Sequence, residues 1–64
     1  MTVADLVRQL EASQYRTDAI ARIIGYVILI QRNGWEGLKL SRQSKHGLNK
    51  TFRSLGIDPE TVAF

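Results

Sequence analysis

Apolar residues near the start of the chain recur at the spacing of an α-helix. Four of them fall at i, i+3, i+4 and i+7, on one helical face: Val3, Leu6, Val7 and Leu10. Thr2 precedes this run and Asp5 stands three residues after Thr2, which is a variant of the capping box that begins helices. We therefore predict a short amphipathic helix over residues 3–13.

A second apolar segment follows Thr17, a favourable N-cap residue, and stops at Asn33-Gly34, a common helix end. Its apolar side chains would surround most of a helix: Ile20, Ile23, Ile24, Val27, Ile28, Leu29 and Ile30. We predict a central helix over residues 18–32. Its small residues, Ala21 and Gly25, would let another helix approach closely.

The β-branched run over residues 26–30 allows a different interpretation. It could form a buried strand that turns at Asn33-Gly34 into residues 35–40, giving an α+β fold with a hairpin at 26–40. We favour the helix because the apolar spacing from Ile20 to Ile28 is helical and the capping residues agree.

The rest of the chain predicts one longer helix and one short helix. Trp35, Leu38 and Leu40 are expected to pin a connector over residues 34–40 to the core. Ser41 can cap a helix over residues 42–55, and Gly56 is suited to its C-terminal end.

Asp58-Pro59 is a strong start signal for a last helical turn, after which Val62 and Phe64 are expected to dock on the core. The predicted fold class is all-α. It is a single domain, residues 1–64, with three principal helices and a short C-terminal one.

Length and composition indicate how stable this domain can be and in which cellular compartment it is expected. A chain of 64 residues buries a small core, so a partner subunit would add stability. The chain has no cysteine, which excludes disulfides and thiolate metal sites and fits a reducing compartment. The longest apolar stretch, residues 19–30, contains Arg22 and has about half the length needed to cross a bilayer. We expect a cytoplasmic protein without a membrane partner.

The net charge of +3 is unevenly distributed. Residues 1–36 carry four basic and four acidic side chains, and residues 58–64 carry two acidic ones. The stretch over residues 37–57 holds no acid and five basic residues: Lys39, Arg42, Lys45, Lys50 and Arg53. Such asymmetry indicates an anionic partner.

The helix predicted over residues 42–55 concentrates this charge. Leu48, Phe52 and Leu55 form a narrow apolar stripe, and long hydrogen-bond donors lie opposite or beside it. Such donors reach phosphates and base edges, and a major groove admits one helix. The candidate nucleic-acid-binding residues are Arg42, Gln43, Lys45, His46, Asn49, Lys50 and Arg53. The alternative interpretation is an ordinary solvated helix face.

Residues 48–59 resemble the end of the second helix-turn-helix of AraC-type regulators. In both, a leucine, a phenylalanine flanked by basic residues and a Gly-x-x-Pro turn occur in similar order. The resemblance implies a DNA-reading helix, but it covers only these residues, and we assign the chain to no family.

Catalytic and metal chemistry find no support in the sequence. His46 is the only histidine, and a metal site needs three or four ligands. No nucleophile–base pair, Walker sequence or paired-carboxylate motif is present. We predict no enzyme, no metal or other cofactor, and no small-molecule substrate.

Two functions from different classes follow. The first is a small regulatory or accessory protein that binds nucleic acid, and DNA in particular, through the helix at 42–55. The second is a protein-interaction or oligomerisation module that uses the apolar helix at 18–32. In either case we expect a homodimer, with interface residues Ile24, Ile28, Leu29 and Trp35.

Overall fold

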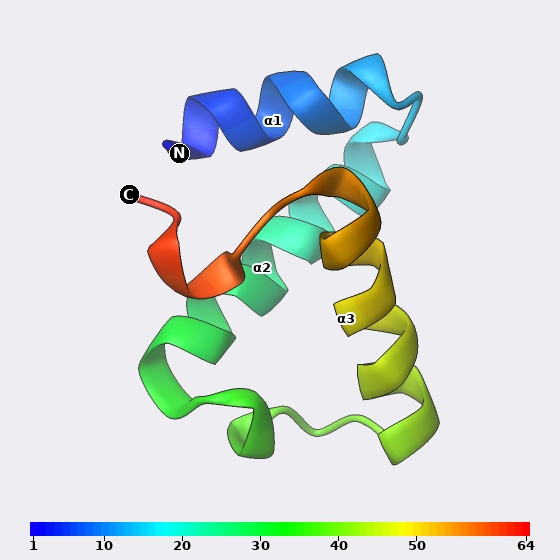
Figure 1. The fold of residues 1–64 in the computed structure, drawn as a ribbon, viewed down its shortest axis with the longest axis vertical. Helices are drawn as coiled ribbons and strands as arrows, with labels where there is room; N and C mark the ends of the chain where they lie inside the picture. The colour runs from blue at the N-terminus through cyan, green and yellow to red at the C-terminus, as the bar shows by residue number, and fades with distance from the viewer.

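A computed structural model describes all 64 residues as an all-α domain. Its three helices are α1 (Val3–Ala12), α2 (Thr17–Asn33) and α3 (Arg42–Leu55). Two 3-10 turns, η1 (Trp35–Gly37) and η2 (Pro59–Thr61), follow α2 and α3 (Figure 1). The predicted fold class is confirmed.

The hairpin alternative at 26–40 is wrong, because its first strand lies inside α2. The helix continues through the β-branched run, since residues spaced three and four apart there are buried together: Ile20, Ile23, Val27 and Ile30. It ends where Gly34 takes a φ of 72°, a backbone conformation that favours glycine.

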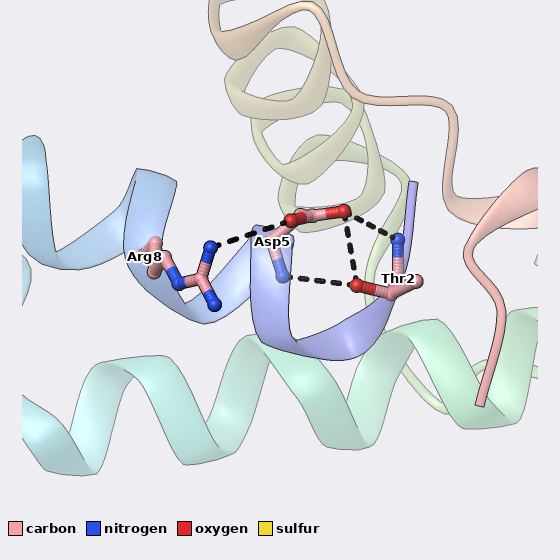
Figure 2. A network of polar contacts seen from close by, with 3 residues as sticks. All are labelled: Thr2, Asp5 and Arg8. Atoms are coloured by element: carbon pink, nitrogen blue, oxygen red, sulfur yellow. Dashed lines mark hydrogen bonds and ion pairs between the residues drawn. The ribbon is translucent and has the colours of Figure 1, made fainter.

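The capping box predicted at the start of α1 is present (Figure 2). The Thr2 hydroxyl accepts a hydrogen bond from the Asp5 backbone N–H at 3.2 Å, and the Asp5 carboxylate accepts one from the Thr2 backbone N–H at 3.2 Å. The Thr2 backbone N–H is the main cause that lowers the pKa of Asp5, and the Thr2 hydroxyl adds to the effect.

The cap predicted for α2 is wrong by one residue. Thr17 is already helical, and Arg16 is the N-cap, without a side-chain hydrogen bond. The reason is that the Arg16 carbonyl accepts the first helical hydrogen bond, from the Ile20 N–H at 2.9 Å. The preceding turn, with Gln14 at a φ of 67°, sets where the extended chain enters α2.

The core gathers side chains from every helix around α2. Its ten residues are Leu6, Leu10, Ile20, Ile23, Val27, Ile30, Leu38, Phe52, Ile57 and Val62. The connector is pinned as predicted: Leu38 is buried, and Trp35 and Leu40 pack half-buried against the core. Phe52 is the one fully buried residue of α3, so it anchors that helix.

The C-terminal segment passes in front of α2 in Figure 1 and ends beside the N-terminus. The Val3 N–H donates to the Ala63 carbonyl at 3.0 Å, and the Ala63 N–H donates to the Met1 carbonyl at 2.8 Å. The predicted last helix is a single 3-10 turn. Val62 is buried as predicted, but the docking of Phe64 is wrong: its side chain is 64% exposed, because the bonded ends direct it past the core.

No helix of the structure combines the length and the apolarity that a membrane crossing requires.

Candidate nucleic-acid interface

The helix α3 packs against the rest of the domain from one side, through the buried Phe52. Its N-terminus is capped by the Ser41 hydroxyl, which accepts from the Ser44 N–H at 3.1 Å. Its C-terminus ends at Gly56 in the left-handed conformation, and the Gln9 side-chain amide of α1 donates to the Leu55 carbonyl. Both predicted caps are confirmed, and α3 is joined to the rest of the domain by the Gln9 bond at its C-terminal end and by the buried Phe52.

The side of α3 away from Phe52 is fully exposed. We call it the outer face of α3 and define it by six residues, all exposed to solvent: Arg42, Gln43, His46, Gly47, Lys50 and Arg53. At a rise of about 1.5 Å per residue, the 14-residue helix presents this face over about 21 Å. The helix itself runs along one edge of the molecule (Figure 1).

Two of the predicted contact residues lie elsewhere. Lys45 and Asn49 are half-buried, and they line a shallow hollow with Trp35 and His46. The helical wheel places Lys45 beside the apolar stripe, and Asn49 lines two hollows together with Trp35. Sequence reasoning placed Asn49 on the outer side because it could not position Trp35.

The cations of α3 have no carboxylate partner. The only ion pair in the protein joins the Arg8 guanidinium and the Asp5 carboxylate at 3.9 Å, on α1 (Figure 2). The basic side chains of the acid-free stretch therefore keep their charges unneutralised. This is the arrangement expected of a surface that attracts an anion.

Two acidic residues lie close to α3. Asp58 and Glu60 line a hollow of about 420 Å³ together with Trp35, Asn49 and Arg53. The Asp58 carboxylate already accepts the Glu60 N–H at 3.0 Å as the cap of η2. Negative charge therefore comes close to the outer face of α3 at Arg53, which lines the same hollow without forming an ion pair.

Gly47 is a feature of this face that sequence reasoning missed. It stands in the interior of α3, where glycine is about 1 kcal/mol less favourable than alanine. A Cβ built on it would meet no atom within 4 Å, so packing in the domain does not require a glycine there. The signal was readable: an isolated glycine among the donors of a predicted helix.

The predicted interface residues do not form one surface. Ile24 and Trp35 are half-buried and pack against the core, where the ring of Trp35 meets that of Phe52 edge to face. Ile28 and Leu29 lie on the outer side of α2: Leu29 is 42% exposed, and Ile28 is half-buried without packing against the core.

No group of three or more histidine, aspartate or glutamate side chains is placed to hold a metal ion. Comparison with known proteins gives no relative: no family model, curated protein or solved structure matches the chain.

Proposed function

We propose that the protein binds nucleic acid, and duplex DNA in particular, by laying the outer face of α3 in a major groove. One observation carries the proposal: this face displays exposed cations and amide or imidazole donors with no carboxylate paired to any of them. Backbone phosphates supply most of the affinity in such complexes, and unneutralised cations are what they require.

The residues of this face divide into two roles. Arg42, Lys50 and Arg53 would neutralise phosphates and hold the helix in register. Gln43 and His46 lie between them and would reach base edges, where Gln is suited to adenine. A major groove about 12 Å wide admits one helix, and α3 is supported from behind so that its free side can enter.

The role of Gly47 is to let the helix backbone approach the nucleic acid. A glycine in the middle of a contacting face lacks the side chain that would hold the two backbones apart. This assignment gives a purpose to a residue that the fold does not need. The protein would act as a regulatory or accessory factor, and its cytoplasmic location stays a prediction.

The test is a fluorescence-anisotropy titration with duplex DNA, single-stranded DNA and RNA at two salt concentrations. We expect duplex binding that weakens steeply with salt, because phosphate contacts release counterions. Replacing Arg42 and Arg53 together by alanine should weaken binding and reduce the salt slope by about 2, one for each lost phosphate contact. The matched control replaces Arg8 and Arg16, which lowers the net charge equally but leaves α3 intact.

Equal weakening by both double variants would mean that only net charge matters, and would overturn the assignment to α3. Absence of micromolar binding to all three nucleic acids at low salt would overturn the function itself. Tighter binding to RNA or to single-stranded DNA would identify that nucleic acid, and not duplex DNA, as the ligand.

A second pair of variants tests the close approach at Gly47. Gly47→Gln adds a long side chain in the middle of the face and should weaken binding, although it removes no charge. Gly47→Ala adds one methyl group and should bind better than Gly47→Gln. Unchanged binding by Gly47→Gln would show that α3 does not enter a groove at this point.

A further inference from the structure

One side of α2 is not covered by the rest of the domain. We call it the outer face of α2: Asp18, Ala21, Arg22, Gly25, Ile28, Leu29 and Arg32. All of them are exposed except Gly25 and Ile28, which are half-buried. A Cβ built on Gly25 would meet no atom within 4 Å, so no side chain lies over the middle of this face.

Two of the exposed large apolar side chains of the protein lie at this face. The three large apolar residues that remain exposed are Met1, Leu29 and Phe64. Leu29 belongs to the face itself. Phe64 lines a hollow of about 430 Å³ with Ile28 and Arg32. On the other flank, Leu29 lines a hollow of about 380 Å³ with Tyr26 and Leu40.

The order of residues on this face is self-complementary. Asp18, Ala21, Gly25, Ile28 and Arg32 follow each other at alternating spacings of three and four, which forms a straight seam along a helix. Gly25 lies at its centre, seven residues from either charged end.

We propose that the outer face of α2 docks on α2 of a second copy of this chain, antiparallel, with the two-fold axis at Gly25. In a two-fold interface each contact occurs twice with the residues exchanged. In this register Asp18 of each chain faces Arg32 of the other. Ala21 faces Leu29, Arg22 faces Ile28, and Gly25 faces Gly25. The small residues allow close approach of the two backbones, and the exposed Leu29 is covered.

Charge selects the antiparallel direction. Neither Asp18 nor Arg32 has an ion-pair partner within the chain. Antiparallel docking joins them in two reciprocal pairs, whereas a parallel dimer would place Asp18 beside Asp18 and Arg32 beside Arg32. The aliphatic stem of Arg22 can cover Ile28 while its guanidinium stays in water.

The expected dimer is weak. The contact follows one 17-residue helix, about 25 Å long. Contact along such a strip buries less surface than the roughly 800 Å² per partner of a typical stable interface. We expect a dissociation constant on the order of micromolar or above, so sedimentation equilibrium should extend to about 1 mM. The mass should rise with concentration from 7.2 kDa towards twice that value.

Charge reversal tests the register. Asp18→Arg and Arg32→Asp should each weaken self-association about tenfold, because both attractive pairs become repulsive. The double variant, Asp18→Arg with Arg32→Asp, should restore it. Both reversals oppose the dipole of α2, so the double variant is expected to have the least stable helix. Its recovery would therefore report the interface and not the fold, which circular dichroism checks separately.

Glycine substitutions give a second, independent test. Gly25→Gln should stabilise the monomer and abolish the dimer, because the added side chains collide at the two-fold axis. The matched control is Gly47→Gln, which makes the same exchange in the interior of α3 and should leave self-association unchanged. The two variants also separate the proposals, since Gly47→Gln is expected to affect nucleic-acid binding.

If the chain stays monomeric at concentrations up to about 1 mM, its self-association is far weaker than that of specific protein interfaces. That result would overturn the proposal. A dimer that neither single charge reversal weakens, or that the double variant fails to restore, would overturn the antiparallel register. These measurements contain no nucleic acid, so their outcome does not depend on the proposed function.

Discussion

The rings of Trp35 and Phe52 meet edge to face, with centroids 6.2 Å apart and planes inclined by 77°. This geometry is favourable for aromatic pairs. It joins the turn after α2 to the only fully buried side chain of α3. The position of the candidate interface therefore depends on Phe52, although Phe52 itself lies on the opposite side of the helix.

Phe52→Ala should unfold most of the protein. Deleting a buried phenylalanine costs about 3–5 kcal/mol, which is comparable to the whole stability expected of a domain this small. Urea denaturation followed by Trp35 fluorescence and by far-ultraviolet circular dichroism measures it. Phe52→Leu keeps most of the buried volume and should remain folded. A stable Phe52→Ala variant would mean that α3 is not anchored there.

Gln31→Ala should loosen the C-terminal segment. The Gln31 side-chain amide donates to the carbonyls of Pro59 at 2.9 Å and Val62 at 2.7 Å. Losing both bonds should lower the free energy of unfolding by about 1–3 kcal/mol. Hydrogen exchange should show reduced protection of the Val3 and Ala63 amides, which bond at the joined ends.

Gln31→Glu is the sharper variant at this position. It preserves the volume of the side chain, but its carboxylate cannot donate to a carbonyl and would face two acceptors. It should destabilise the protein at least as much as Gln31→Ala at pH 7. A neutral effect of Gln31→Glu would show that the two hydrogen bonds contribute nothing.

Asp5 should make the stability of α1 depend on pH. Its pKa is lowered in the folded protein, chiefly by the backbone N–H of Thr2, with the hydroxyl of Thr2 and the charge of Arg8 also lowering it. The ionised carboxylate therefore stabilises the fold above the pKa of an unfolded aspartate, about 3.9, and this contribution is lost as the pH falls through the lower folded value. Urea denaturation of the protein and of Asp5→Asn should differ most at neutral pH and converge in acid. A difference that stays constant with pH would contradict this.

Two glycines should respond oppositely to alanine. Gly47→Ala should raise the free energy of unfolding by about 0.5–1 kcal/mol, because alanine favours the helix interior. Gly56→Ala should lower it by about 1–2 kcal/mol, since Gly56 has a φ of 68°, where a Cβ is strained. Neither Cβ would meet another atom within 4 Å, so the backbone alone decides the sign. Thermal unfolding of both variants measures it. If both variants changed the free energy of unfolding in the same direction, backbone conformation would not be its cause.

The positions of the helices and most of their ends are predictable from the sequence alone. These features are local: the Thr2–Asp5 box, the Ser41 cap and the glycines 34 and 56 act within a few residues, so periodicity and capping chemistry suffice to predict them. The same holds for the cationic character of residues 37–57, which is a property of composition. The outer face of α3 follows largely from helical spacing.

Features that depend on residues far apart in the chain are set by tertiary packing. Phe64 is exposed beside the joined ends, and Lys45 and Asn49 are half-buried at the hollow that they share with Trp35. The other elements cover only part of α2, so Ile23 is buried and Leu29 stays exposed. A helical wheel gives the angle of each side chain about its own axis. It carries no information on which neighbour occupies that direction, because that is set by long-range packing and by bonds such as those from Gln31 to the C-terminal segment.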